Sequence, residues 1–397
     1  MVLERATAFR RTSLSPGVFF RSFDWLLFLT ALVLTGYGMA MIYSATHGDS
    51  SAGDALVYVR NQLVGLGLGL VAGIGLSLLD FERLLGWQKY IYGFMVLLLV
   101  VTLFIGSGRN DAHRWIALPF FDLQSAELAK LLLIVTLSAF LAEGLELRGR
   151  FRYVLLAVGY VAVPTLLVYL EPDLGTSLVL VAILVATLLA WGIRWGHLAA
   201  LAGAGVAMMV LVLRGLPALG INLLKEYQVQ RLLVFLNPER DLTGEGYQLM
   251  QSRIAVASGM YTGKGYMQGT QTHLNFLPEH HTDFIFAVIG EELGFVGAIL
   301  LLALYLLLIW RVLRIAGRSK SMYGTLIGAG VAGAIVFQVF VNVGMTIGIM
   351  PVTGIPLPLL SYGSASLVVF WMAIGLLESI QVRSLAAQFN KRIPPGV

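Results

Sequence analysis

A stretch of eighteen residues, LPEHHTDFIFAVIGEELG at 277–294, concentrates groups that can move protons. Carboxylates and imidazoles are the side chains that most often act as general acids and bases. Only 12% of the whole chain is charged, so the density within this stretch calls for an explanation. The six side chains concerned are Glu279, His280, His281, Asp283, Glu291 and Glu292. The pattern predicts a proton-handling cluster where a polar segment meets an apolar helix.

Asp283 is the leading candidate, because it stands at the start of the apolar segment that begins with Phe284. One interpretation is structural, since Asp is a preferred helix N-cap and favours the positive end of the helix dipole. The other is chemical, with the carboxylate acting as a general base. A cap and a base are compatible roles, and the sequence leaves both open.

The neighbours of Asp283 are weaker candidates. We include Glu279 and His281 among the substrate contacts, although a histidine in a loop often has no chemical role. Glu291 and Glu292 either belong to a solvated first stretch of the helix or are buried, which is rare and costly for a carboxylate in a membrane.

A second set of charges lies in an apolar segment near 126–142. Glu127 and Lys130 are spaced i, i+3, so they share a helix face and can pair. Charges at membrane depth normally face the bundle interior or a watery cavity and mark functional sites, although a buried ion pair can also be purely structural. Just before this segment, Arg114 and Trp115 suit an anionic head group under an aromatic belt, or an ordinary interfacial anchor.

Two loops complete the candidate site. Solvation is the default interpretation of the basic residues in the long loop before Asp283, but several of them could converge on a diphosphate; they include Arg231, Arg240, Arg253 and Lys264. The segment MPVTGIPLPLLSYGSAS at 350–366 holds no charge and three prolines. Non-helical backbone at membrane depth must line a cavity or pack against protein. This segment is therefore predicted to form one wall of a groove, with Ser361 as a candidate contact.

The composition indicates a polytopic membrane protein that positions these residues on helices. Of the 397 residues, 58% are hydrophobic, whereas soluble domains are about 45–50% apolar. A helix needs about 20 largely apolar residues to cross the bilayer. The predicted fold class is all-α with about ten transmembrane helices, near 25–44, 61–79, 88–106, 126–142, 153–170, 174–193, 197–214, 284–311, 323–349 and 364–381.

The distribution of Lys and Arg predicts the orientation of these helices. Seventeen of the 27 basic residues fall at the termini and in the loops of one side, which the positive-inside rule identifies as cytoplasmic. The whole chain, 1–397, is predicted to be one membrane-embedded domain with both termini cytoplasmic. A large extracytoplasmic loop, 215–282, lies between helices seven and eight, and no cleavable signal peptide is evident.

Several classes of function lose support. The chain has no cysteine, which excludes disulfides and thiolate chemistry. It lacks a Walker-type phosphate loop, a dinucleotide fingerprint and a histidine pair at metal-binding spacing. Its net charge of +5 fits basic cytoplasmic loops, so no nucleic-acid partner is expected.

Six motifs run along nearly the whole chain: HRWIAL with LQSAELAK at 113–130, EPDLGTS at 171–177, YQVQRLLVFLNPERDLTGEGYQLMQSRIAVASG at 227–259, GKG at 263–265, LPEHHTDFIFAVIGEELG at 277–294 and NVGMTIGIMPVTGIPLPLLSYG at 342–363. With the ten-helix layout, they resemble the SEDS family of bacterial shape, elongation, division and sporulation proteins, to which RodA and FtsW belong. The segment PVTGIPLPLLSYG is more similar to RodA members. Two departures, QSAEL for the usual QPSEL and Ser364–Ala365–Ser366 after SYG, lie away from Asp283.

The resemblance implies a peptidoglycan glycosyltransferase. Members of the family polymerise lipid II outside the bacterial cytoplasmic membrane and release undecaprenyl diphosphate. They work with a class B penicillin-binding protein, and other elongation-machinery proteins are expected as partners. Asp283 matches the family's proposed catalytic aspartate in the HTDF motif. Arg114, Trp115, Glu127 and Lys130 are then expected around the central cavity and lipid groove.

The chemistry of the candidate residues fits this implication. Joining an α-linked sugar diphosphate into a β-1,4 bond is an inverting displacement, which needs a base near the acceptor hydroxyl and positive charge at the leaving diphosphate. A divalent ion, Mg²⁺ or Mn²⁺, could bridge carboxylate and diphosphate, and no other cofactor is expected. Two alternatives stay open: a flippase for the lipid-linked precursor, and a non-catalytic scaffold for a penicillin-binding protein. The absence of evident inverted repeats disfavours the flippase.

Overall fold

The structure, a computed structural model, describes residues 16–47, 55–106, 115–117, 122–218, 231, 234–235, 241, 244–273, 276–277 and 280–392. Its long helices are α3 Trp25–Thr46, α4 Ala55–Leu78, α6 Gln88–Ile105, α7 Ser125–Glu143, α8 Phe151–Leu170, α9 Leu174–Trp191, α10 Trp195–Val210, α16 Gly294–Arg318, α17 Met322–Ile347 and α18 Ser364–Arg392. Short elements connect or cover them: α2 Pro16–Ser22, α5 Arg83–Gly86, β1 Trp115–Ala117, β2 Asp122–Gln124, η1 Leu145–Leu147, η2 Leu211–Gly215, α11 Leu216–Ala218, α13 Glu245–Ser258, α14 Thr270–His273 and α15 Ile285–Glu292.

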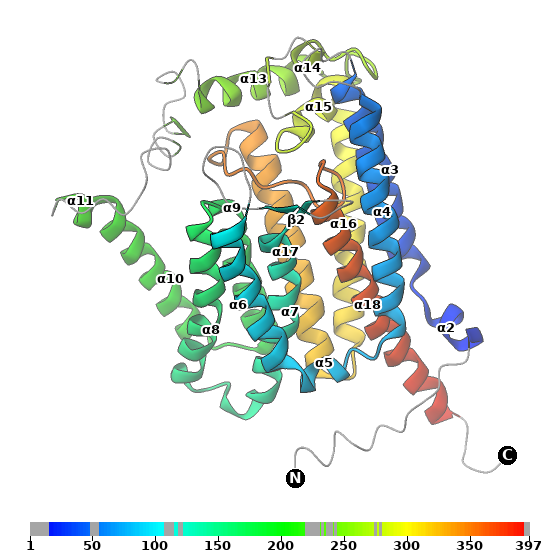
Figure 1. Cartoon of the computed structure of the whole chain (residues 1–397), viewed down its shortest axis with the longest axis vertical. Helices are drawn as coiled ribbons and strands as arrows, with labels where there is room; N and C mark the ends of the chain where they lie inside the picture. The colour runs from blue at the N-terminus through cyan, green and yellow to red at the C-terminus, as the bar shows by residue number, and fades with distance from the viewer. Residues whose placement is uncertain are drawn as a thin grey trace.

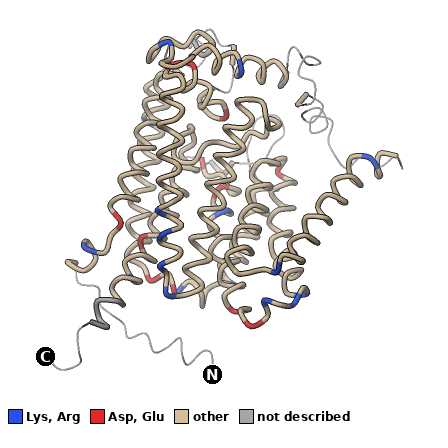
Figure 2. Tube along the Cα trace, turned by 180° about the vertical axis from the view of Figure 1, so that it is seen from behind, with Lys and Arg blue, Asp and Glu red and all other residues tan. Residues whose placement is uncertain are grey.

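Ten helices in the described part of the chain are long and apolar enough to cross a membrane, which confirms the predicted number. Figure 1 shows them as one bundle, with α13 and α14 across one end. We call this end the loop end. The opposite end carries α2 and the last turns of α18, and we call it the terminal end. Charged residues gather at the two ends, and few lie between them (Figure 2).

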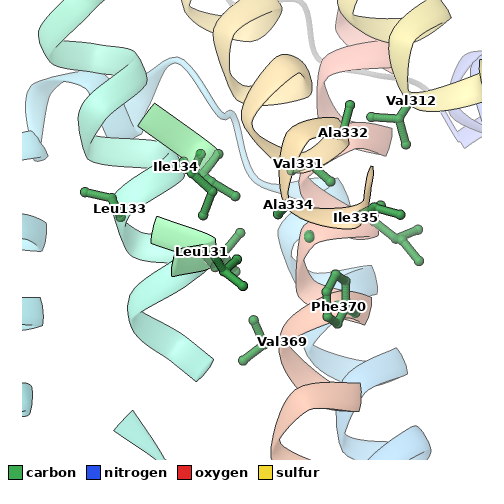
Figure 3. Packing of buried hydrophobic residues seen from close by; sticks show 14 of the residues in the cluster. Leu131, Leu133, Ile134, Val312, Val331, Ala332, Ala334, Ile335, Val369 and Phe370 are labelled. Atoms are coloured by element: carbon green, nitrogen blue, oxygen red, sulfur yellow. The ribbon is translucent and has the colours of Figure 1, made fainter. Parts of the chain in front are cut away.

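The bundle has a central group of helices and a peripheral group. The spans of α7 and α18 are 78% and 83% buried, whereas the span of α10 with η2 and α11 has no buried residue. A helix that is apolar all round can be buried on every side. Figure 3 shows Leu131 and Ile134 of α7 toward Val331 and Ile335 of α17, with Phe370 of α18 beside them. These central helices hold the candidate residues Glu127 and Lys130 in a rigid frame.

The structure corrects two sequence-based helix boundaries and adds one hairpin. The predicted helix at 284–311 is interrupted where Gly294 adopts a φ of +62°, a conformation that favours glycine. The short α15 therefore precedes α16, which extends to Arg318. The predicted helix at 197–214 starts at Trp195 and passes into the π-helical η2. Finally, β1 and β2 form a two-stranded antiparallel hairpin that the all-α prediction missed, because three-residue strands carry almost no periodic signal.

Candidate active site

Asp283 lies in a turn and not within a helix. The first helical residue of α15 is Ile285, with Phe284 at the N-cap position and no side-chain cap. The N-cap position, which one interpretation assigned to Asp283, is therefore occupied by Phe284. The Asp283 backbone carbonyl instead accepts a hydrogen bond of 2.7 Å from Asn342 Nδ2 of α17, and the residue is half-buried.

The same contact places Asp283 inside the loop end of the bundle. Asn342 precedes Thr346 by four residues, and the Thr346 carbonyl accepts a 2.9 Å hydrogen bond from Ser252 of α13. One helical turn rises about 5.4 Å. Asp283 therefore lies about one turn deeper in the bundle than the contact between α13 and α17.

The uncharged segment between α17 and α18 packs against Asp283. Asn342 Nδ2 also donates to the Ile355 carbonyl at 2.7 Å, so one amide joins this segment to the Asp283 backbone. A β carbon on Gly354 would lie 3.3 Å from Asp283 Oδ2. The segment is not helical between Ile347 and Ser364, as predicted. It forms a wall of backbone beside the carboxylate.

Ser361 belongs to the internal bracing of this wall. Its hydroxyl accepts a 2.9 Å hydrogen bond from the Leu357 N–H. Its carbonyl accepts from Gln62 Nε2 of α4 at 3.2 Å, and Gln62 Oε1 accepts from the Gly363 N–H at 3.1 Å. The predicted contact of Ser361 with substrate stays a prediction.

The two histidines before Asp283 differ in their surroundings. His280 is buried, and its ring nitrogens lie at hydrogen-bond distance from the carbonyls of Leu277 and Ala45. His281 is half-buried, and its carbonyl accepts from the Tyr362 N–H at 3.1 Å. The His281 ring lies 5.1 Å from the Tyr58 ring, centroid to centroid. Of the two histidines, His281 thus lies closer to the wall beside Asp283 and is the less buried.

Glu291, at the far end of α15, is fully buried and binds the outer loop. Its Oε1 accepts from Lys264 Nζ at 2.6 Å and from the backbone N–H groups of Thr270 and Gln271 at 2.9 and 3.0 Å. The interpretation of Glu291 as a solvated residue is therefore wrong. Six helical residues separate it from the start of α15, about 9 Å at 1.5 Å per residue. Lys264 is bound at this far end, and its contact with substrate stays a prediction.

Glu292 binds the same loop from the other side and is also fully buried. Its Oε2 accepts from Ser44 Oγ of α3 at 2.5 Å and from the Met267 N–H at 3.3 Å. We call Glu291, Glu292 and Lys264 the outer clasp. It ties α3, α15 and the segment 264–271 together.

Glu127 and Lys130 form the buried ion pair that their spacing predicts. Lys130 Nζ lies 2.7 Å from Glu127 Oε1, and both side chains are less than 5% exposed. Lys130 also lies 5.5 Å from the centroid of the Phe370 ring. Among the described residues, none hydrogen-bonds to Glu127 Oε2. A buried carboxylate oxygen left in this way is costly. The role of the pair around a substrate cavity stays a prediction.

The turn between α8 and α9 connects this pair to the wall beside Asp283. Asp173 caps α9 and accepts from Gln124 Nε2 of β2 at 3.2 Å. Gly175 packs on the same wall, because a β carbon there would lie 2.8 Å from the Thr353 carbonyl oxygen. One continuous layer of contacts therefore runs from the start of α7 to Asp283.

The remaining candidates divide into described and undescribed residues. Trp115 lies in β1 and is 37% exposed, and Arg231 is half-buried. Arg253 donates a 2.7 Å hydrogen bond to the carbonyl of Gly348, the C-cap residue of α17. Arg114, Glu279 and Arg240 lie outside the described residues. In the described part of the chain, no group of three His, Asp or Glu side chains could hold a metal ion.

Sequence reasoning missed Asn342 and Gln62. Both are buried amides in membrane-spanning helices that fix the backbone of the candidate site. Their signal was present, because polar residues inside membrane spans are uncommon and usually have a partner. Uncharged amides give a weaker signal than the charged side chains of the same spans.

Comparison with known proteins identifies the family of this chain. Residues 24–385 match the FtsW, RodA and SpoVE family, described as "Cell cycle protein". The chain is 38% identical over 340 residues to peptidoglycan glycosyltransferase MrdB of Escherichia coli (strain K12), with 86% of this chain and 90% of that protein covered. It is 34% identical over 429 residues to peptidoglycan glycosyltransferase RodA of Treponema pallidum (strain Nichols), with 91% and 98% covered.

Solved structures of related proteins have the same fold as this chain. A chain in the structure described as "Structural coordination of polymerization and crosslinking by a peptidoglycan synthase complex" superposes with a TM-score of 0.74 at 32% identity, covering 91% of this chain and 98% of that one. Rod shape determining protein RodA of Thermus thermophilus superposes with a TM-score of 0.64 at 31% identity, covering 90% and 96%. The predicted multi-pass bacterial membrane protein and the predicted peptidoglycan glycosyltransferase class are confirmed. The chain belongs to the FtsW, RodA and SpoVE family, whose SEDS motifs it carries.

Proposed function

We propose that this chain polymerises lipid II into glycan strands for cell elongation, with Asp283 as the general base. The observation that carries the proposal is the setting of Asp283. Its backbone is fixed by Asn342, and its carboxylate lies beside the uncharged wall at Gly354. A base held by rigid elements can keep the geometry that proton transfer requires.

The reaction follows from these residues. The Asp283 carboxylate accepts the proton of the acceptor sugar hydroxyl as that oxygen attacks the anomeric carbon of the donor. The bond from this carbon to the diphosphate breaks with inversion, and undecaprenyl diphosphate leaves. Lys130, Arg114 and Arg231 are the cations proposed to face substrate charge. Trp115, Glu127, Glu279, His281 and Ser361 are the proposed contacts around the lipid and sugars.

The loop end is proposed to face the outside of the cell. In the sequence, seventeen of the 27 basic residues fall at the termini and in the loops predicted to be cytoplasmic, which supports this orientation through the positive-inside rule. Lipid II would then meet Asp283 from the outer leaflet, with its polyprenyl chain along the apolar helices. The active site would be extracytoplasmic.

A divalent cation, Mg²⁺ or Mn²⁺, is the proposed cofactor of this site. Mg²⁺ commonly binds one or two carboxylates together with substrate phosphates and water. Asp283 could supply the carboxylate, and the diphosphate and water could supply the rest. When bound, such an ion would neutralise developing charge on the leaving group.

A class B penicillin-binding protein is the proposed partner. The description of the superposing chain as part of a peptidoglycan synthase complex that couples polymerization and crosslinking supports this. Polymerisation by one protein beside crosslinking by the other would give coordinated growth of the wall.

Asp283→Asn tests the proposal, because it keeps the size of the side chain and removes the base. We expect glycan polymerisation from purified lipid II in proteoliposomes to fall about 10²- to 10⁴-fold, the usual contribution of general base catalysis. The thermal midpoint and binding of the penicillin-binding protein should not change. Full polymerisation by this variant would remove Asp283 from the mechanism.

The same reconstitution separates the alternatives. If the native chain moves labelled lipid II across the bilayer and forms no polymer, the flippase function is correct. If it does neither and only supports its partner, it is a scaffold.

A further inference from the structure

Two arginines cross at the terminal end of the bundle. Arg148 lies in the connection between α7 and α8, and Arg194 lies in the turn between α9 and α10. A β carbon on Gly149 would lie 2.9 Å from Arg194 Nη2, and one on Gly192 would lie 4.0 Å from Arg148 Nη1. Each guanidinium therefore reaches over the backbone of the other connection. We call Arg148 and Arg194 the arginine crossing.

The arginine crossing forms no ion pair in the described part of the chain. Neither arginine forms an ion pair with a described carboxylate, including the exposed Glu143 and Glu146 nearby in sequence. Arg148 Nη2 contacts only the sulfur of Met322, at 3.5 Å, and its buried Nε has no described partner. Two neighbouring cations outside any ion pair repel each other, so an external anion would stabilise this arrangement.

Two helix N-termini add positive potential at the same place. Neither α8, which follows Arg150, nor α10, which follows Arg194, has a side-chain cap. The two starts adjoin, because the rings of Phe151 and His197 lie 5.1 Å apart. Uncapped N–H groups and the positive ends of both dipoles favour an anion.

Apolar side chains are exposed on the two helices that start at the crossing. Figure 1 shows α10 leaving the bundle beside α8 and diverging from it toward the loop end. The described residues of α10 are not buried, and Trp195 is 79% exposed. On α8, Leu155 and Leu156 are 49% and 61% exposed. A ligand that fits this site needs an anionic head and apolar chains.

We propose that the arginine crossing binds the phosphate of an anionic phospholipid, whose acyl chains lie along the exposed faces of α8 and α10. Arginine suits this role because its planar fork donates two hydrogen bonds to one phosphate. Basic pockets between membrane helices recognise anionic lipid head groups in this way. The bound lipid would fasten the start of α10 to the bundle.

Native mass spectrometry of the full-length chain tests the site. The chain is titrated with phosphatidylglycerol and, separately, with phosphatidylcholine. We expect tighter binding of phosphatidylglycerol, and an apparent Kd about 10-fold or more higher in Arg148→Gln/Arg194→Gln. The double variant Arg21→Gln/Arg318→Gln removes two exposed arginines at the same end and should change the Kd less than about 2-fold.

Gly149→Ala probes the geometry without removing charge. Its methyl group would displace the Arg194 guanidinium and should weaken binding by several fold, whereas Gly196→Ala, which meets nothing within 4 Å, should not. Equal affinity for phosphatidylglycerol and phosphatidylcholine would overturn the proposal. So would an equal loss of phosphatidylglycerol affinity in the Arg148→Gln/Arg194→Gln and Arg21→Gln/Arg318→Gln variants. If millimolar pyrophosphate displaces phosphatidylglycerol and binds the site as tightly as the lipid does, the site binds a soluble anion and the proposal is wrong. Retained lipid II polymerisation confirms that the variants fold.

Discussion

The two ends of α15 carry carboxylates in contrasting surroundings. At the far end, Glu291 is fully buried, and its Oε1 accepts from one ammonium group and two backbone N–H groups. At the near end, Asp283 is half-buried, and its backbone rather than its carboxylate is held by Asn342. Glu291 thus holds a loop, whereas Asp283 is the base of the proposed reaction. Acidic residues that lie close together in a sequence can therefore have different surroundings and different roles in the folded chain.

Loss of Glu291 should have the largest effect on stability. Glu291→Ala leaves Lys264 and two backbone N–H groups without their acceptor, which should lower the free energy of unfolding by about 3 kcal/mol. The thermal midpoint of the purified protein measures this loss. Asp283→Ala should cost less than about 1 kcal/mol, because the residue is half-buried. Equal losses from both changes would break the contrast between the two ends of α15.

Asn342→Leu should lower both the stability of the protein and its rate of lipid II polymerisation, because Asn342 holds the backbone of Asp283. The carbonyls of Asp283 and Ile355 would lose their shared donor, at a cost of about 2 kcal/mol. Displacement of the base should also slow lipid II polymerisation about 10-fold. Gln338→Leu is the matched control, because Gln338 lies one turn earlier in α17, is buried, and has no described hydrogen-bond partner. A loss of activity as large in the control would argue against positioning by Asn342.

Ser361→Ala separates bracing from substrate contact in the wall beside Asp283. Loss of the acceptor for the Leu357 N–H should cost about 1 kcal/mol. If Ser361 only braces the wall, the KM for lipid II will stay within about 2-fold of its native value. A raised KM with unchanged stability would assign Ser361 to the substrate.

Lys264→Gln should have the smallest effect on stability, below about 1 kcal/mol, because its side chain is 28% exposed and water weakens the pair. A double-mutant cycle with Glu291→Gln measures their coupling. The initial rate at low lipid II concentration tests the other role of Lys264. A large loss of polymerisation rate without loss of stability would indicate that Lys264 contacts the substrate.

Much of the architecture could be predicted from local patterns. Ten apolar segments give ten helices, because a membrane-spanning segment must satisfy its backbone within itself. The i, i+3 spacing of Glu127 and Lys130 gives their ion pair for a similar local reason. The prolines of 350–366 give the non-helical wall. The break at Gly294 was missed, because glycines within an apolar segment are often tolerated in a helix.

The sequence by itself determined the helices, the family and Asp283 as the matching aspartate, since these depend on composition and motif order. Only the tertiary structure decided what each acid near Asp283 contacts. Glu291 and Glu292 became parts of the outer clasp because Lys264, Ser44 and the loop backbone meet them from distant parts of the chain. Asn342 became the support of Asp283 for the same reason. Hydrogen-bond partners far apart in sequence leave no periodic pattern, so such roles appear only when the chain is folded.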